Sequence, residues 1–330
     1  MEDVIKRQHF VQRAYLDKFR NEEGYLYAYD KDKLTSFPAK PKDVANKHRF
    51  YDYPFEEDKR TQSIENKLSK LENIQIVSIT SFINSINSCI RNSSFHTKVL
   101  NAEQKKELAH IIGLQFLRTL EHRKFISDFF QSTKHKLRQE AEEIHREGVE
   151  IILHKTPLEY KLLVENFLLE TKERSIGRSI EYIEWLYSEG LPIIQGEDMF
   201  RRCKNLADIL LSHIWVIGVN TFSKDKSFYT SDRPVAKTHP LYGVASHGVQ
   251  ISFPLNSEII LILFERQSYK QYEVFENKII QLTTEQIDSL NLMQVILCNR
   301  QVYCRDDNFN LVERVLKSNS YDLSSGKRRC

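Results

Sequence analysis

Apolar residues recur at helical spacing through the middle of the chain, from about residue 55 to residue 212. Over 61–86 they fall three and four positions apart, which places them on one face of a helix. Those residues are Ile64, Leu68, Leu71, Ile74 and Val77. The same periodicity predicts further helices over 161–180 and 199–213, so the middle of the chain is expected to be helical.

Short aromatic and β-branched runs mark residues 1–54 as a compact α/β entry segment. The run over 25–30 predicts a short strand, and the run over 34–37 is expected to pair with it. Another extended piece is expected over 48–55. Strands this short need a helix to cover them, and an amphipathic helix over 9–19 is the candidate.

From residue 213 onward, short β-branched and aromatic runs are typical of strands. A helix interrupts them over 283–300, opened by Thr283 as N-cap with Glu285 in the first turn. The strands are predicted over 213–220, 227–235, 249–255, 258–265 and 301–306.

This order of elements predicts an α+β protein. We expect a central helical bundle packed against a small mixed or antiparallel sheet, built from N-terminal and C-terminal strands together. A sheet shared in this way would make residues 1–330 a single structural unit. Its parts would be the entry segment 1–54, the helical region 55–212 and a C-terminal α/β segment 213–330.

Composition changes this picture little. Only 10 Gly and 8 Pro among 330 residues favour long helices, and a net charge of +3 permits an anionic partner without requiring one. Five cysteines without a C-x-x-C pair fit a reducing compartment and exclude a zinc knuckle. No apolar run approaches the roughly 20 residues of a membrane span, and no signal core is present. We therefore expect a cytoplasmic protein that does not enter the membrane.

The helix predicted over 102–130, with Asn101 as N-cap, carries polar residues on an otherwise apolar face. Gln115, Arg118 and His122 are three and four residues apart and so should stack along one face. A guanidinium in apolar surroundings must be paired, so Arg118 and Arg123 are candidates for holding a phosphate or a carboxylate. The alternative is a buried structural ion pair. The two interpretations predict different partners for Arg118: a ligand, or another side chain.

A second candidate follows a predicted strand, where Ser231 and Asp232 precede Arg233 and Pro234. An acid at the lip of a sheet lies where α/β proteins collect the polar groups of their sites. The alternative is an Asx-turn in which Asp232 only caps its own loop.

His9, near Arg7 and Arg13, is a third candidate, for acid–base chemistry or for a structural hydrogen bond. Glu65 and Glu72 are seven residues apart and share a helix face, which could bind a divalent metal ion or be solvated. The motifs of P-loop enzymes, dinucleotide-binding proteins, zinc proteases and serine hydrolases are absent from the sequence.

Taken together, these stretches resemble a bacterial family catalogued as domain of unknown function 4238. The resemblance extends over roughly residues 6 to 305. The pieces that carry it are QHFVQRAYLDKF, YLYAYD, IENKLSKLE, GLQFLRTLEHR, YTSDRPV, FPLNSE and NLMQVILCNRQVYCRD. The resemblance implies one domain in which distant residues converge. Those residues are His9, Glu72, Gln115, Arg118 and Asp232.

The chain departs from the family pattern at two positions. The family's first stretch usually reads QHFVPRFYL, and here Gln12 replaces the proline while His9 and Tyr15 stay in register. The usual SDNP is SDRP here, with Arg233 at the position of the asparagine. Members look as though they often sit among bacterial accessory and antiviral defence genes, which favours a nuclease or toxin-like effector.

The first hypothesis is therefore a hydrolase of phosphodiesters in RNA or DNA, with a toxin-like or antiviral role. Arg118 and Arg123 would steady the phosphate, and His9 would act as general acid or base. Asp232 and Glu72 would orient the base or hold a divalent metal ion. Gln115 completes the candidate catalytic set, and the candidate substrate-binding residues besides Arg123 are Arg13, Tyr15 and Ser231.

The second hypothesis is a non-catalytic nucleotide-binding or regulatory interaction protein that uses the same polar cluster. The partners expected from these hypotheses are a nucleic acid, a second copy of the chain or another protein of a defence system.

Overall fold

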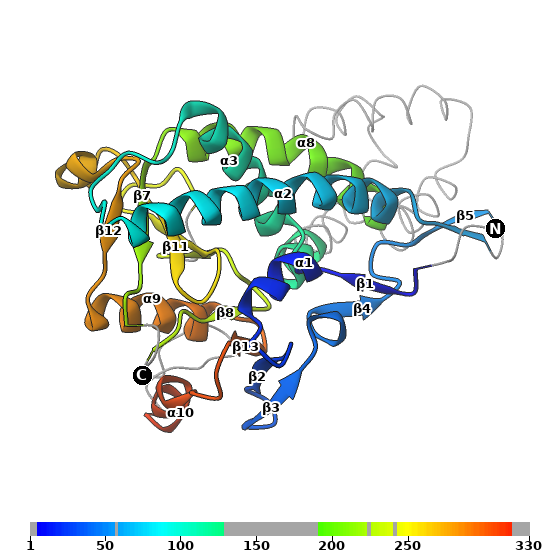
Figure 1. The fold of residues 1–330 in the computed structure, drawn as a ribbon. Helices are drawn as coiled ribbons and strands as arrows, with labels where there is room; N and C mark the ends of the chain where they lie inside the picture. Colours follow the sequence, from blue (N-terminus) through cyan, green and yellow to red (C-terminus); the bar gives the residue numbers. More distant parts are fainter. Residues whose placement is uncertain (1–4, 57–58, 129–190, 223–225, 240–242, 319–330) are drawn as a thin grey trace, which may run out of the picture. The chain divides into compact units, whose positions relative to one another are not determined.

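The computed structural model describes residues 5–56, 59–128, 191–222, 226–239 and 243–318 (Figure 1). The chain divides into two compact units. The first comprises Met1–Asp52, Gln62–His122 and Asp198–Cys330, and the second Tyr53–Thr61 and Arg123–Glu197. The expectation of one structural unit over the whole chain stays a prediction.

The second unit begins with a hairpin. Strands β5 (Tyr53–Glu56) and β6 (Lys59–Thr61) pair antiparallel, with a bulge in the register between Pro54 and Glu56. The helical region was expected to begin at residue 55, and this bound is wrong because the hairpin lies there. The helix expected over 61–86 is confirmed as α2, which begins at Ser63. The helix expected over 161–180 lies outside the described residues.

A five-stranded mixed sheet forms the centre of the first unit, in the order β12-β7-β11-β10-β9. β12 pairs parallel with β7, and the other pairs are antiparallel. Every residue of β7 and β11 is buried, as expected for strands covered on both faces. The strands are β7 (Ile214–Val219), β9 (Ala236–Lys237), β10 (Gln250–Pro254), β11 (Ile259–Phe264) and β12 (Ile279–Gln281).

Helices cover one face of this sheet. α2 (Ser63–Arg91), α3 (Ala102–Leu117) and the C-terminal part of α8 (Leu191–Leu211) lie together on it (Figure 1). The Trp215 indole of β7 donates to the carbonyl of Leu210 at the end of α8, 2.8 Å away. At Gly113, α3 and α8 approach so closely that a Cβ would lie 3.3 Å from the carbonyl oxygen of Cys203.

A second, four-stranded antiparallel sheet joins the two ends of the chain, in the order β3-β2-β13-β8. β2 (Leu26–Asp30) and β3 (Thr35–Ala39) come from the N-terminal segment, and β8 (Thr230–Ser231) and β13 (Gln301–Cys304) from the C-terminal one. The predicted sharing of one sheet is confirmed, and so is the α+β class. The prediction of a single sheet missed the larger one, whose strands all follow residue 213.

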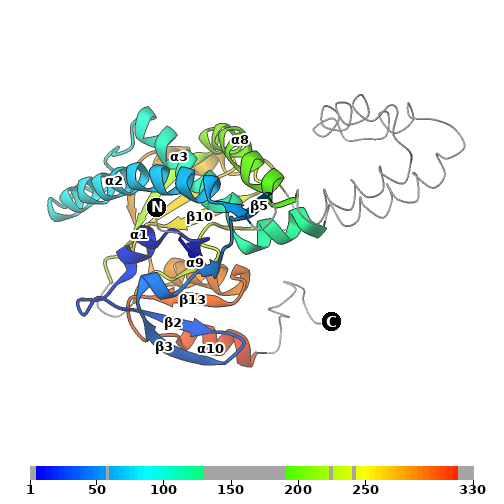
Figure 2. The same cartoon turned by 90° about the vertical axis from the view of Figure 1, so that its right-hand side faces the viewer.

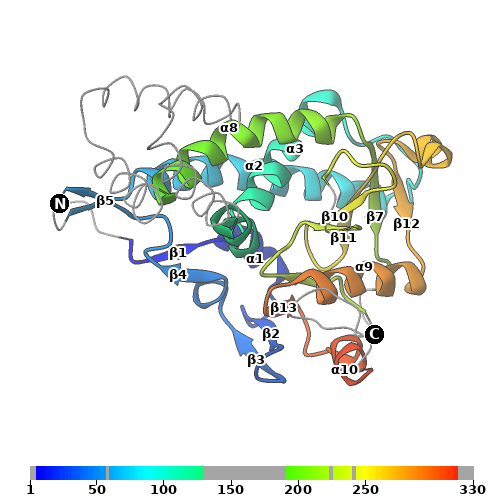
Figure 3. The ribbon, with the colours of Figure 1, turned by 180° about the vertical axis from the view of Figure 1, so that it is seen from behind.

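Helix α9 (Thr284–Leu297) lies between the two sheets (Figures 2 and 3). Ile287 and Leu290 belong to the core of the five-stranded sheet. Val295, further along the helix, belongs to a second core with the four-stranded sheet and with α10 (Asn310–Lys317). The predicted cap is confirmed, because the Thr283 hydroxyl accepts from an N–H of the first turn.

The N-terminal segment departs from its prediction at residues 9–19. Strand β1 (Arg7–His9) pairs with β4 (Asn46–His48), and the helix shrinks to α1 (Arg13–Leu16) followed by the 3₁₀ turn η1 (Asp17–Phe19). The N–H groups of Phe10 and Val11 both donate to the carbonyl of Ala45, which holds the chain extended before α1. A second 3₁₀ turn, η2, spans Pro41–Asp43.

Within the described residues, no helix combines the length and the apolar character needed to cross a membrane.

Candidate functional site

The predicted helix over 102–130 is broken at Arg118. Helix α3 ends at Leu117 with Arg118 as its C-cap, and a new helical stretch begins at residue 120. The Thr119 hydroxyl accepts from the N–H of His122 at 3.4 Å, so Thr119 caps the second stretch. The predicted stripe of Gln115, Arg118 and His122 on one helix is therefore wrong. Asn101 is confirmed as the N-cap of α3, with its side chain accepting from the N–H of Gln104.

The guanidinium of Arg118 is buried, with 4% of the residue exposed. Each of its three nitrogens has a protein partner. Nε donates to the hydroxyl of Tyr51 at 3.3 Å, Nη1 to the carboxylate of Glu72, and Nη2 to the carbonyl of His9. The side-chain partner that the structural interpretation predicted is thus present. Arg118 joins α3, α2 and β1 at one point.

These partners keep the Arg118 guanidinium positively charged although it is buried. Burial alone would lower the pKa of the guanidinium, but Tyr51 and Glu72 together raise it above its ordinary value. A buried cation with a carboxylate partner and further hydrogen bonds is the arrangement in which burial is tolerated. Arg118 is therefore a fixed positive charge at the centre of the site.

His9 lies against Arg118 with a free ring nitrogen. Its ring hydrogen-bonds the backbone of Pro41, while Nε2 is buried without a hydrogen-bond partner in the described part of the chain. The bond to a carbonyl then uses the N–H of Nδ1, and Nε2 keeps its lone pair. Burial first, and the charge of Arg118 second, lower the pKa of His9. The ring is thus a neutral imidazole with an unused basic nitrogen.

Glu65 is the other group whose protonation is shifted here. Burial raises the pKa of its carboxyl to about 7, with Arg118 opposing the rise and Glu72 and Asp52 adding to it. Oε2 is buried and has no hydrogen-bond partner among the described residues. The shared helix face of Glu65 and Glu72, noticed in the sequence, signalled this neighbourhood. That spacing alone does not show that burial raises the pKa of Glu65.

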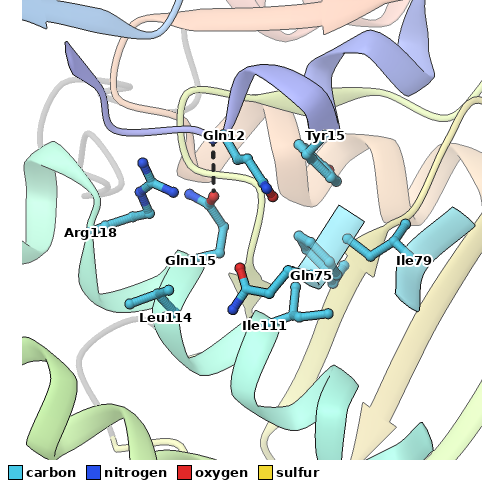
Figure 4. Close-up of a pocket in the computed structure, with 9 residues that line it drawn as sticks. Gln12, Tyr15, Gln75, Ile79, Ile111, Leu114, Gln115 and Arg118 are labelled. Atoms are coloured by element: carbon cyan, nitrogen blue, oxygen red, sulfur yellow. Dashed lines mark hydrogen bonds between the residues drawn. The ribbon is translucent and has the colours of Figure 1, made fainter. Parts of the chain in front are cut away.

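Gln115 and Gln12 fasten the N-terminal segment above α3 (Figure 4). The Gln115 amide donates to the carbonyl of Phe10 at 3.1 Å, and its oxygen accepts from the N–H of Gln12 at 3.4 Å. The Gln12 amide donates to the carbonyl of Glu72 at 3.0 Å. Both glutamines therefore recognise backbone, and the cavity that they line with Arg118 has room for about one water molecule.

Gln8 was not among the predicted site residues, although it begins the QHF motif. It is fully buried: its oxygen accepts from the N–H of Tyr51 at 2.5 Å, and its amide donates to Asp52. The other carboxylate oxygen of Asp52 lies 3.6 Å from the guanidinium of Arg49. The strand alternation of β1 could have revealed Gln8, because residues 7 and 9 point to the opposite side.

Asp232 does not join this cluster. Its buried carboxylate accepts from three consecutive backbone N–H groups, those of Asn299, Arg300 and Gln301, at 2.7, 2.7 and 2.9 Å. None of its described hydrogen bonds goes to His9 or Arg118. Asp232 caps the turn before β13, not its own loop as the Asx-turn alternative proposed. The structure thus brings His9, Glu72, Gln115 and Arg118 together and leaves Asp232 in the four-stranded sheet.

Of the remaining candidates, Tyr15 lines the small cavity together with Gln115 and Arg118, and the charge of Arg13 acts on His9. The Ser231 hydroxyl donates to Gln294 at 2.7 Å. The Tyr15 hydroxyl donates to the carbonyl of Pro254 at 2.8 Å. Both are buried. Arg13 is exposed and lies 4.0 Å from Asp17. Arg123 belongs to the second unit.

A polar cavity of about 390 Å³ lies elsewhere in the first unit, beside α9 and α10. Its charged groups are largely paired with one another or with a hydroxyl. Lys226 lies 2.8 Å from Asp288, and Asp306 accepts from the hydroxyl of Ser227 at 2.9 Å. Its wall contains no histidine and no group with a buried unpartnered atom among the described residues, so the Arg118 cluster remains the better candidate.

The pKa of Glu65 leads to a testable pH dependence. The folded value lies above the ordinary 4.5, so the contribution of Glu65 to stability is complete below about pH 4.5 and is lost as pH rises through 7. Between pH 5 and pH 8, wild-type stability should fall relative to Glu65→Gln by on the order of 2 kcal/mol. Denaturant unfolding at several pH values measures this difference. Glu107→Gln, at an exposed position of α3, should track the wild type; parallel profiles for all three proteins would contradict the prediction.

Comparison with known proteins gives one match. A family model described as Protein of unknown function (DUF4238) matches residues 7–308. No curated protein and no solved structure matches the chain.

Proposed function

We propose that this chain, which belongs to the DUF4238 family, is a hydrolase of phosphodiesters that acts on nucleic acid as a toxin-like or antiviral-defence effector. One observation carries the proposal. A neutral imidazole with a free Nε2 and a carboxyl with a pKa of about 7 both lie within the electrostatic reach of one buried guanidinium. An acid and a base poised near neutral pH are what general acid–base catalysis requires.

The roles follow from the protonation of each group. His9 Nε2 is the base that accepts a proton from the attacking water. Glu65, about half protonated near pH 7, is the acid that returns a proton to the leaving oxygen. Arg118 supplies positive charge as the phosphate becomes more negative, since a guanidinium has five N–H donors and only three contacts are made here.

The side chains of the cluster do not favour the metal pair expected from the sequence. Glu72 is bound to Arg118, and Asp232 is occupied by the backbone N–H groups of the turn into β13. The described residues contain no group of three or more His, Cys, Asp or Glu that could hold a metal ion. No step in this proposal therefore passes through a metal held by Glu72 and Asp232.

A second function, non-catalytic binding or regulation, is favoured by a different observation. Each nitrogen of Arg118 already has a protein acceptor, and Gln8, Gln12 and Gln115 all bind backbone. A cluster of this kind can have a purely structural role, in which it holds the N-terminal segment against α2 and α3. The two functions differ in whether His9 and Glu65 are needed for anything besides stability.

The test is cleavage of labelled single-stranded RNA and DNA by the purified chain. His9→Ala should lower the cleavage rate by about 100-fold or more, because it removes the base. His247→Ala, at an exposed position of the turn before β10, serves as the matched control and should cleave like the wild type. Thermal unfolding of each variant shows whether it is folded.

Two results would argue against the hydrolase. One is a wild-type chain that cleaves neither substrate at any pH between about 5 and 9. The other is a folded His9→Ala variant that cleaves as fast as His247→Ala. Either result would leave the binding or regulatory function as the better account of the cluster.

A further inference from the structure

The first unit carries a concentrated positive charge beside His9. We call residues 5–9 and 40–49 the basic ribbon: they contain strands β1 and β4 and the turn η2 (Figure 1). These fifteen residues include six lysines and arginines and one acidic residue, Asp43, for a formal charge of +5. The whole chain carries +3, so the other residues together carry −2. The small net charge of the whole chain therefore includes a local excess of positive charge in the basic ribbon.

Most of this charge is exposed and uncompensated. Arg7 lies 3.2 Å from Asp43, and both are exposed. The lysines have no carboxylate partner among the described residues, and each of them is exposed to solvent. They are Lys6, Lys40, Lys42 and Lys47. An exposed excess of one sign, in which the lysines have no carboxylate partner, attracts a polyanion.

The strand register places Arg7, one of these charges, on the face of the candidate base, whereas Lys47 pairs with Gln8 on the other face. Arg7 and His9 lie on the same face of β1, since side chains alternate along a strand, and their Cα atoms are about 6.6 Å apart. Arg7 pairs with His48 and His9 with Asn46, so the same face of β4 is polar as well. A phosphate held at Arg7 would lie two residues along the strand from His9, on the same face.

An aromatic ring accompanies the lysines. The Lys40 ammonium lies over the ring of Tyr25, 5.6 Å from its centre, and Tyr25 is partly exposed. Surfaces that bind single strands combine cations for the phosphates with aromatic rings on which bases stack. This pairing favours a flexible single strand over a duplex, whose bases are already stacked.

We propose that the basic ribbon is the docking surface for the phosphate backbone of a single-stranded nucleic acid. The inference deepens the proposed function and rests on it for the identity of the cleaved bond. Binding itself does not depend on cleavage. Four unpaired lysines correspond to about four neutralised phosphates, so log K should fall with log salt with a slope of about −3.

The experiment uses the full chain and fluorescein-labelled single strands of about 12 nucleotides, one of RNA and one of DNA, long enough to cover one such surface. Fluorescence anisotropy is measured over a range of NaCl concentrations. Lys42→Gln/Lys47→Gln should weaken binding about 10-fold at low salt and make the slope less negative by about 1.4, since two phosphate contacts are lost. Lys106→Gln/Lys204→Gln changes the net charge equally at exposed helical positions and should bind like the wild type.

Three outcomes test whether the basic ribbon binds single-stranded nucleic acid. Equal binding by the two double variants overturns the inference and leaves the hydrolase proposal to its own cleavage test. Binding that follows the expected slopes without any cleavage supports the docking surface and counts against the hydrolase. Poly-glutamate of equal charge that competes as well as the oligonucleotide overturns the inference in favour of an acidic protein partner.

Discussion

Replacing Arg118 by methionine should lower the free energy of unfolding by about 3–5 kcal/mol. The substitution leaves the hydroxyl of Tyr51, the carbonyl of His9 and the carboxylate of Glu72 without their common donor. Buried acceptors that lose their donor carry the full cost of their desolvation. The change is measured from the midpoint and slope of denaturant unfolding.

The ion pair can be separated from the hydrogen bonds by a second substitution. Arg118→Met/Glu72→Gln should recover part of the loss, because no uncompensated carboxylate remains. Arg7→Met is the matched control: that arginine pairs with Asp43 at 3.2 Å, with both side chains exposed, and should cost less than about 1 kcal/mol. If Arg118→Met cost no more than this control, Arg118 would not be the point that holds the cluster together.

Replacing Asp232 by alanine should cost about 3 kcal/mol, the second largest effect expected. Its carboxylate is the acceptor for three consecutive N–H groups, and a methyl group accepts from none of them. Asp232→Asn keeps one amide oxygen and should lose about half as much. Asp288→Ala, which removes a partly exposed partner of Lys226, should stay within about 1 kcal/mol.

Asp232 also separates the sequence-based site from the structural one. The structure gives it a role in the turn before β13, so the loss of stability and any loss of activity should occur together in Asp232→Ala. An Asp232→Ala chain as stable as the wild type but without activity would contradict this assignment. It would restore the catalytic role expected from the sequence.

Structural features that depend on a few neighbouring residues were predicted correctly from the sequence. Thr283 and Asn101 begin helices as expected, because an N-cap depends on hydrogen bonds that reach only three residues along the chain. The strand pairing of 25–30 with 34–37 was also predicted correctly, since a hairpin is a local structure. The class of fold followed from these local elements.

Features that depend on distant contacts were not predicted. Apolar periodicity continues across Arg118 and Thr119, but a cap at Thr119 ends one helix and starts the next. Residues 9–12 have helical spacing, yet Ala45 and Gln115 hold them extended from far along the chain. Tertiary hydrogen bonds override local propensity in both places.

The membership of the site was predicted in part for the same reason. The need of Arg118 for a partner was evident from its apolar neighbours, and Glu72 was already a candidate. The pairing of the two joins α3 to α2 over 46 residues, which no spacing rule encodes. Gln8 and Tyr51 were missed because their roles arise only when β1 lies beside the turn that follows β4.

The pairing of β2 with β13 has a consequence for the nascent chain. Tyr303 of β13 hydrogen-bonds the backbone of Ala45, the residue whose carbonyl holds Phe10 and Val11 beside the Arg118 cluster. Until the ribosome has translated residue 304, strand β2 of the four-stranded sheet therefore has an unpaired edge. The Arg118 cluster then also lacks the hydrogen bond between Tyr303 and Ala45. The proposed hydrolase activity should therefore appear only after translation of this strand.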